Sequence, residues 1–286
     1  MTPRTAPTVL EDSDYARFRE LVRSRIGVEI PDVRRGDLER AVGEALVTTG
    51  LETPEQLYRS LTGPQNGEEA LAAMIPTLTV GETHFFRNRP QIEALERQIL
   101  PELIERARGT RRLRIWSAGC STGEEPYTIA ILLDRALPDL AEWDIRILGT
   151  DIDDQALEKA RRGSYRSWSF REVPPEVKER YFRAEGDRMD LDERLRRMVT
   201  FKELNLISDR YPSPETGTDR MDLVLCRNVL IYFRMETTRA VVSCMHSALV
   251  PGGWLVVGHV EPSQDVFVAF AELNLPGTIS YQKLPP

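Results

Sequence analysis

One stretch, from Arg114 to Tyr127, constrains the fold more than any other part of the chain. Residues 113–117 have the apolar pattern of a buried strand, and an apolar repeat with helical spacing follows. Between them, Gly119 and Gly123 predict a tight turn that lets the backbone approach a ligand, where free helix N–H groups point outward. Strand, glycine turn and helix start together indicate a site for a nucleotide-like ligand.

The same stretch has a plainer interpretation as a capped helix. Ser121 with Glu124, and Thr122 with Glu125, each have the spacing of a capping box, in which side chains satisfy helix-end N–H groups. On this alternative the glutamates only cap the helix and the glycines only turn the chain. The residues that follow in the chain bear on this choice.

Composition is that of a folded globular protein. The 286 residues suffice for one large domain or two smaller ones, with 41% hydrophobic and 29% charged residues. A net charge of -7 argues against nucleic acid as a partner. No apolar run is long enough to cross a bilayer, so we expect no membrane insertion.

The three cysteines are far apart and the first residues lack signal-peptide features, which predicts a cytoplasmic protein without disulfides. The cysteines and histidines do not complete a metal site, so we expect no metal.

Residues 13–83 predict a helical domain, because apolar residues such as Tyr15, Phe18 and Val22 recur at helical spacing. Its predicted exposed sides carry arginines mixed with acids. This mixture indicates either a solvated face or a docking face for an acidic helical partner. Residues 84–111 follow as a linker region whose long helix we expect to join two domains.

Residues 112–286 alternate between strands and helices, which predicts an α/β fold with a largely parallel sheet covered by helices on both sides. The expected strands lie at about 112–117, 145–150, 198–204, 221–226, 254–260 and 278–283. The expected helices lie at about 124–137, 154–162 and 235–249. An insertion at about 164–200 is too long for an ordinary connection and predicts a subdomain or a functional loop.

Polar or glycine residues stand just past the ends of four predicted strands, at Gly119, Asp151, Asn205 and Asn228. Open parallel sheets bind ligands at that edge, and an acidic residue after the second strand is suited to ribose hydroxyls. The alternative at the second strand is helix capping by Asp153 or its neighbour, which does not use Asp151. Four such positions together favour a nucleoside site.

These residues lie within motifs that resemble those of the CheR-type chemotaxis protein methyltransferases. The matching stretches are Glu82-Thr83-His84-Phe85-Phe86-Arg87, Trp116 to Tyr127, Asp151-Ile152-Asp153, Asn205-Leu206, Cys226 to Phe233 and Gly258-His259. The resemblance runs from about residue 13 to residue 283. It implies a class I S-adenosylmethionine-dependent methyltransferase, with a Rossmann-like and mostly parallel sheet, an N-terminal all-helical domain and a small β-subdomain insertion.

The resemblance also implies a reaction and the residues that serve it. The implied enzyme is a protein-glutamate O-methyltransferase, which transfers a methyl group from S-adenosyl-L-methionine to glutamates of methyl-accepting chemoreceptors and leaves S-adenosyl-L-homocysteine. A monomer is expected. Arg87 and Tyr232 are the implied catalytic residues, beside the transferring methyl group. The implied cofactor contacts are Thr83, Arg87, Gly119, Glu125, Asp151, Asn205, Leu206, Arg227 and Asn228. Glu125 is expected near the methionine end, Asp151 near the ribose, and Asn205 and Leu206 near the adenine.

Two departures from the family pattern stand out. Gly81 occupies a position where many relatives have Asn, so one side-chain contact to the cofactor is expected to be missing. The segment Phe182 to Phe201 is short and lacks the glycine-rich loop with which some members grip a receptor's C-terminal pentapeptide. We therefore predict that this protein does not use such a tether.

Two other functions fit parts of the pattern less well. A nicotinamide-dependent dehydrogenase shares the strand, turn and helix, but its fingerprint is G-x-G-x-x-G, whereas Gly119 and Gly123 are four positions apart. A non-catalytic adaptor that kept the fold would have little reason to retain Arg87 and Tyr232. A methyl-transfer assay separates these alternatives.

Overall fold

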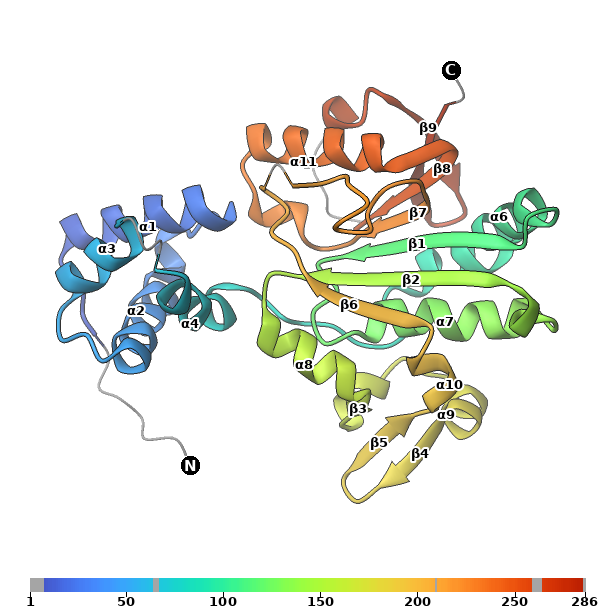
Figure 1. The fold of residues 1–286 in the computed structure, drawn as a ribbon, viewed down its shortest axis with the longest axis horizontal. Coiled ribbons are helices and arrows are strands. Elements are labelled where there is room, and N and C mark those ends of the chain that lie inside the picture. The colour runs from blue at the N-terminus through green and yellow to red at the C-terminus, as the bar shows by residue number, and fades with distance from the viewer. Residues whose placement is uncertain (1–7, 64–66, 209, 259–263, 285–286) are drawn as a thin grey trace.

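The computed structural model describes residues 8–63, 67–208, 210–258 and 264–284. His259 of the Gly258-His259 motif and the expected end of the fifth strand at residue 260 lie outside the described residues. Figure 1 shows a helical bundle beside a twisted sheet, with a small second sheet at one end.

The bundle forms from the helices that the apolar spacing predicts. They are α1 (Asp12–Ile26), η1 (Asp32–Arg34), α2 (Arg35–Thr49), α3 (Pro54–Thr62) and α4 (Glu68–Leu78). In α1 the repeat residues Phe18 and Val22 are almost completely buried, and the helix ends at Gly27, whose φ of 78° suits glycine. α3 begins with a capping box between Thr53 and Gln56. These helices enclose a core of their own.

The next helical segment packs against the sheet. It consists of α5 (Arg89–Ala94), a π-helical turn η2 (Leu95–Ile99) and α6 (Leu100–Ala107). Its buried residues Leu95, Ile99 and Leu103 share a core with the first strand, including Ile115. The connection between the bundle and the sheet is therefore the segment 79–88 (Figure 1). The helix that we expected to join the two parts comes after this segment and packs against the sheet.

The main sheet of the described residues has seven strands in the order β6-β2-β1-β7-β8-β10-β9. The strands are β1 (Arg112–Ala118), β2 (Asp144–Asp151), β6 (Val199–Glu203), β7 (Met221–Cys226), β8 (Leu249–Val257), β9 (Phe270–Leu275) and β10 (Thr278–Lys283). β10 runs antiparallel to both of its neighbours, and the other pairs are parallel. This confirms the largely parallel sheet that the alternation predicts.

Both faces of this sheet are covered, as expected. The helices are α7 (Glu124–Ala136) and α8 (Asp154–Arg162) on one face and α11 (Met235–Ala248) on the other (Figure 1). Successive residues of β1 point to opposite faces: Ile115 joins the core under α7, and Trp116 joins the core under α11. β1 is therefore buried from Leu113 to Ala118, as a strand covered on both faces should be.

The insertion forms a small β-subdomain. Its elements are β3 (Ser164–Tyr165), η4 (Ser167–Phe170), α9 (Pro175–Tyr181), β4 (Phe182–Glu185), β5 (Arg188–Leu191) and α10 (Glu193–Arg196). The strands pair antiparallel in the order β3-β5-β4. Phe85 from the crossing segment anchors the subdomain, because its ring lies 5.5 Å from that of Phe170 and 4.9 Å from that of Phe182.

Candidate active site

The candidate site lies where the strand order reverses, between β1 and β7. Strands β2 and β6 continue the sheet on one side of β1, and β8 continues it on the other side of β7. Figure 1 shows that the strands end toward the helical bundle, so the cavity there has walls from both parts. This is the edge at which open α/β sheets bind ligands.

One cavity brings together every residue that the sequence implicates in cofactor binding or catalysis. These lining residues are Thr83, Arg87, Gly119, Glu125, Asp151, Asn205, Leu206, Arg227, Asn228 and Tyr232. They come from the crossing segment 79–88, the ends of β1, β2, β6 and β7, the start of α7, and the short helix η5 (Leu230–Tyr232).

The glycine turn after β1 requires glycine at its first position. Gly119 has a φ of 72°, and a Cβ added to it would lie 2.4 Å from Cγ2 of Val229. The N–H groups of Gly119 and Cys120 donate to the carbonyl oxygen of Thr150, at 2.8 and 2.9 Å, which ties the turn to β2. The turn therefore has room only for glycine at this position, and the backbone of Gly119 lines the cavity.

The predicted capping boxes at the start of α7 are wrong. Gly123 is the N-cap, with a φ of 91°, and no side chain caps the helix. Thr122 Oγ1 instead donates to Glu124 Oε2 at 2.6 Å, and Ser169 Oγ donates to Glu124 Oε1 at 2.9 Å. Burial raises the pKa of the Glu124 carboxyl. The residue at the cap position is thus a glycine without a side chain, and the Thr122 hydroxyl that could have capped the helix bonds Glu124 instead.

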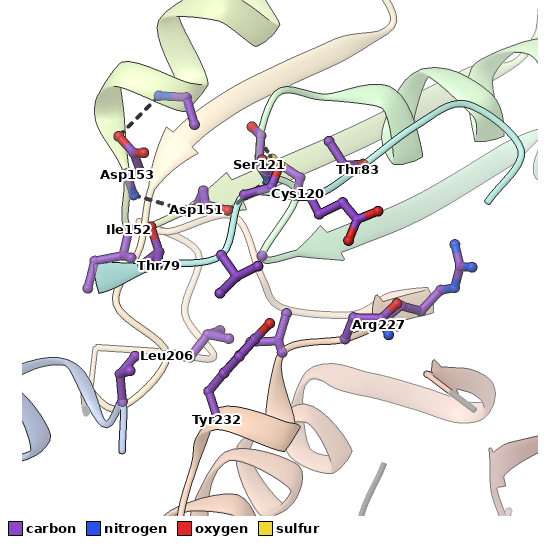
Figure 2. Close-up of a pocket in the computed structure, with 18 of the residues that line it drawn as sticks. Thr79, Thr83, Cys120, Ser121, Asp151, Ile152, Asp153, Leu206, Arg227 and Tyr232 are labelled. Carbon is purple, nitrogen blue, oxygen red and sulfur yellow. Dashed lines mark hydrogen bonds between the residues drawn. The ribbon is translucent and has the colours of Figure 1, made fainter. Parts of the chain in front are cut away.

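Asp151, at the end of β2, links the strand to the glycine turn. Its Oδ2 accepts from the N–H of Ser121 at 2.7 Å, and its Oδ1 accepts from the N–H of Asp153 at 2.9 Å. Burial raises the pKa of the Asp151 carboxyl. Asp153 caps α8 by accepting from the N–H of Ala156 at 3.1 Å, so the capping alternative accounts for Asp153 and leaves Asp151 facing the cavity (Figure 2).

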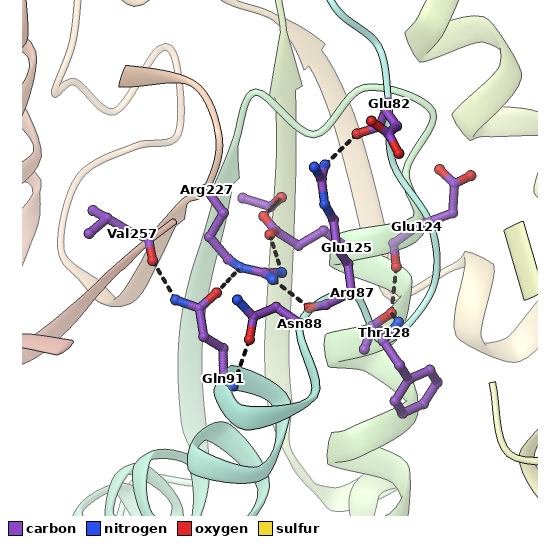
Figure 3. A network of polar contacts seen from close by, with 11 residues as sticks. Glu82, Arg87, Asn88, Gln91, Glu124, Glu125, Thr128, Arg227 and Val257 are labelled. Carbon is purple, nitrogen blue, oxygen red and sulfur yellow. Dashed lines mark hydrogen bonds and ion pairs between the residues drawn. The ribbon is translucent and has the colours of Figure 1, made fainter. Parts of the chain in front are cut away.

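Glu125 and Arg227 form a buried ion pair at the base of the cavity (Figure 3). Glu125 Oε1 accepts from Ser117 Oγ at 2.7 Å, and Oε2 lies 3.0 Å from Arg227 Nη1. Arg227 Nε donates to Gln91 Oε1 at 2.8 Å, and Nη2 donates to the main-chain oxygen of Arg87. The pair thus joins β1, α7, α5 and β7 at the switch point.

Two further polar residues, Tyr232 and Arg87, line the cavity. Figure 2 shows the ring of Tyr232 reaching from η5 into the cavity, opposite Asp151. The guanidinium of Arg87 turns back along the crossing segment, where Nη1 donates to the main-chain oxygen of Glu82 (Figure 3). The carbonyl oxygen of Tyr232 accepts from the N–H of Glu29 at 2.8 Å, which ties η5 to the bundle.

Asn205 links the sheet to the bundle. Its Nδ2 donates to the carbonyl oxygen of Arg25 at 2.7 Å, and its Oδ1 accepts from the N–H of Ile207 at 3.1 Å. Leu206 lies beside it in the cavity wall. Asn228 follows Arg227 with a φ of 61°, a conformation that Asn tolerates better than most residues.

Several wall residues were not among the cofactor contacts that the sequence predicts. They include Ile26, Val28, Thr79, Val80, Cys120, Ile152 and Phe233. Ile152 has a local signal, since it follows the acidic residue at a strand end. Ile26 and Val28 have none, because only the docking of α1 brings them to the cavity. Gly81 also lines the cavity, and its carbonyl oxygen accepts from Ser121 Oγ at 3.2 Å.

The residues of this cavity fit an adenosyl cofactor. Asp151 offers a carboxylate for ribose hydroxyls, Ile152 and Leu206 offer apolar contacts for a base, and the bare backbone of Gly119 lines the wall between them. Among the described residues no cluster of His, Cys, Asp and Glu could hold a metal ion. No helix in the described part of the chain is long and apolar enough to span a membrane.

This fold and this cavity define a class I methyltransferase that uses S-adenosylmethionine. Residues 81–275 match the family described as CheR methyltransferase, SAM binding domain, and the chain therefore belongs to the CheR family.

Relatives in chemotaxis are similar along most of the chain. Chemotaxis protein methyltransferase 2 of Vibrio cholerae is 33% identical over 96% of this chain and 94% of its own. The probable chemotaxis protein methyltransferase of Rhizobium etli is 38% identical over 71% of this chain and 76% of its own. The chemotaxis protein methyltransferase of Salmonella typhimurium is 35% identical over 91% of this chain and 86% of its own. This chain is thus a chemotaxis-type methyltransferase.

Proposed function

We propose that this protein methylates glutamate side chains of methyl-accepting chemoreceptors, giving glutamyl methyl esters. The observation that carries the proposal is Arg87, a guanidinium on the wall of the same cavity as the residues suited to the adenosyl cofactor. A guanidinium matches a carboxylate in two-point geometry. The names of the relatives in chemotaxis support the choice of receptor.

The reaction needs little proton transfer from the protein. A glutamate has a reference pKa of about 4.3, so the substrate carboxylate is already deprotonated at neutral pH. When bound, the cofactor supplies a methyl carbon that its sulfonium has already activated. The task left to the protein is to hold the carboxylate oxygen, the methyl carbon and the sulfur in line, which can lower a barrier by roughly 7–11 kcal/mol.

Arg87 is the residue that we assign to steering the substrate carboxylate. Its side chain must guide the carboxylate without holding it so tightly that the ground state is stabilised as much as the transition state. The present contact of Arg87 with a neutral main-chain oxygen of Glu82 is exchangeable for that purpose. Tyr232 is assigned to shape the channel beside the methyl group, where its ring enters the cavity (Figure 2).

The other lining residues are assigned to the cofactor. Asp151 would accept from the ribose hydroxyls, and Glu125 would face the amino group of the methionine end, with Arg227 holding it in place. Asn205 and Leu206 would lie near the adenine. Thr83, Gly119 and Asn228 would contribute backbone and small polar contacts.

The arginines of the bundle bear on how a receptor docks. Six arginines of α1, η1 and α2 form ion pairs with acidic side chains. These are Arg17, Arg19, Arg23, Arg34, Arg35 and Arg40. Such pairing leaves a weak outward field and favours the solvated face over a purely electrostatic docking face.

The test is transfer of a radiolabelled methyl group from S-adenosylmethionine to the cytoplasmic fragment of a cognate chemoreceptor. A glutamyl ester predicts label in the receptor that is released as methanol by mild alkali. The control fragment carries glutamine at the target positions and should take up no label. Alkali-stable label, or no transfer by protein that calorimetry shows to bind the cofactor, would overturn the proposal.

We also propose that no receptor pentapeptide is needed. The hairpin of β4 and β5 has four residues in each strand and only residues 186–187 between them, which supports a subdomain too short to grip a peptide. Calorimetry with a receptor C-terminal peptide tests this, and binding in the micromolar range would contradict it. Sedimentation tests the expected monomer in the same samples.

A further inference from the structure

Two guanidinium groups from distant parts of the chain meet at one residue on the cavity rim. Arg87 Nη1 donates to the main-chain oxygen of Glu82, and Arg171 Nη2 lies 3.2 Å from Glu82 Oε1. Glu82 itself lines the cavity. Arg171 follows η4 and so belongs to the β-subdomain. The rim therefore carries a second positive group beside the one assigned to the substrate carboxylate.

Arg171 is held in place by its neighbours. Its guanidinium carbon lies 4.1 Å from the ring centre of Trp168, and Nη1 donates to the carbonyl oxygen of Trp168 at 3.2 Å. The next residue, Ser169, fixes this segment, because its carbonyl oxygen accepts from the N–H of Phe85 at 3.0 Å. Trp168 is 63% exposed and so presents apolar surface next to the cation.

The ion pair between Arg171 and Glu82 can be exchanged at small cost. The side chains are 26% and 55% exposed, and partly exposed ion pairs of this kind contribute little to stability. An incoming carboxylate can replace that of Glu82, which stays free to move into water. Glu82 thus occupies the position that an acidic group of the substrate could take.

The arrangement matches a helical substrate with two acidic side chains. Side chains three or four positions apart on a helix have Cβ atoms about 5–6 Å apart. The two guanidinium groups both contact Glu82, Arg87 at its main-chain oxygen and Arg171 at its carboxylate, so they can face neighbouring side chains of one bound helix. One acidic side chain would then face Arg87 while its neighbour on the helix faces Arg171.

We propose that Arg171 and Trp168 form a second binding point for the substrate helix, which takes an acidic side chain one helical turn from the glutamate to be methylated. This inference rests on the proposed function, and it adds that the enzyme selects substrates with a second acidic side chain near the target glutamate. Arg171 is a positioning residue that exchanges its ion pair with Glu82 for one with the substrate, and Trp168 packs against the apolar side of the same helix.

The test compares two forms of a cognate receptor fragment that retains a single target glutamate. One form keeps an acidic residue three or four positions from the target, and the other has glutamine there. For the unaltered enzyme we expect KM to be about fivefold lower for the acidic form at low salt. In Arg171→Met that ratio should fall to about twofold or less, with kcat little changed, and Arg171→Lys should restore part of it.

Two further variants sharpen the result. Glu82→Gln removes the internal competitor, so KM for the acidic form should fall below that of the unaltered enzyme. Arg166→Met is the matched control, since Arg166 is an exposed arginine of the same subdomain that pairs with Asp187, and both KM values should stay unchanged.

The inference is overturned if Arg171→Met raises KM equally for both fragments, which would indicate a structural role, or changes neither. These outcomes require that the unaltered enzyme methylates the fragments. If it binds cofactor and methylates neither fragment, the proposed function itself fails, and the inference fails with it.

Discussion

Arg227 Nη1 lies 3.0 Å from Glu125 Oε2, and the two side chains are only 4% and 14% exposed. The pair connects the end of β7 with the first turn of α7, across the point where the strand order reverses. A buried ion pair adds little net stability, but removing one partner leaves an uncompensated charge. The base of the cavity therefore depends on both residues.

Arg227→Met should lower the free energy of unfolding by about 3–5 kcal/mol, because Glu125 would remain buried without its cation. Urea denaturation measures this. The matched control is Arg59→Met, which breaks an exposed pair with Glu55 and should change stability by about 0.5 kcal/mol at most. A loss below about 1 kcal/mol in Arg227→Met would show that the pair is not buried as described.

Gly119→Ala should destabilise the protein and weaken cofactor binding. The substitution strains a φ of 72° and drives a methyl group against Val229. Gly50→Ala is the control, because Gly50 has a φ of 70° with no atom within 4 Å of an added Cβ, so only the backbone strain of about 1–2 kcal/mol applies. The difference between the two variants measures the clash. Equal losses of stability would mean that the turn moves away from Val229.

Asp151→Asn should weaken binding of S-adenosylhomocysteine by roughly 10- to 100-fold at neutral pH, since hydrogen bonds to a charged group contribute about 1.5–3 kcal/mol. Burial holds the pKa of this carboxyl above its ordinary value of 3.8. Protonation below that pKa removes acceptors, so affinity should fall with decreasing pH sooner than for an exposed aspartate. Calorimetry across mildly acidic pH checks this, and the same pH step in Asp151→Asn would refute the assignment.

Glu124→Gln should make stability less dependent on pH. Burial raises the pKa of Glu124 in the folded protein, so the folded state binds the proton more tightly than the unfolded chain. The free energy of unfolding then falls as pH rises between the unfolded and folded pKa values, and stays reduced at neutral pH. Glutamine keeps the contacts to Thr122 and Ser169 without the charge.

Thermal melts of Glu124→Gln at neutral pH should give a Tm equal to or a few degrees above that of the unaltered protein. The gap should close as pH falls toward 4.5, the ordinary pKa of the side chain. If Glu124→Gln lowers Tm by the same amount at neutral and at acidic pH, the charge of Glu124 is not what destabilises the folded protein.

Arg87→Ala should reduce kcat for methyl transfer roughly 100-fold or more, the usual effect of losing a preorganised group at a reacting centre. Folding should survive, because the main-chain oxygen that accepts from Arg227 remains. Circular dichroism and cofactor affinity serve as controls, and Arg87→Lys should recover part of the rate. Activity close to that of the unaltered enzyme would remove Arg87 from the mechanism.

The parallel sheet followed from sequence because its strands are buried and its helices amphipathic. The expected helix at 154–162 matches α8, since Asp153 caps it and Gly163 ends it at a φ of 63°. The edge strand β9 escaped notice, because its residues are half exposed and mix charged with apolar side chains. A regular apolar pattern arises where one face of an element is buried, and β9 is only partly buried, so its sequence lacks such a pattern.

Some site residues can likewise be predicted from the local sequence, and others reach the cavity only through tertiary packing. Asp151 and Glu125 stand at strand and helix ends, where chain direction alone brings them to one edge. Ile26 and Val28 reach the cavity only because the bundle docks there, through Asn205 and Glu29. The capping boxes failed because the backbone angle of Gly123, which sequence spacing does not specify, decided the helix start.

The docking of α1 onto the sheet sets a lower limit on the size of a working enzyme. A Cβ on Gly27 would lie 2.6 Å from Ile207, so the two bodies touch closely there, and Glu29 meets Arg234 at 2.6 Å nearby. Truncation to the sheet alone would expose Ile207 and Phe233 and leave the chamber open on one side. Any trimmed or transplanted version must carry the bundle along as part of its catalytic unit.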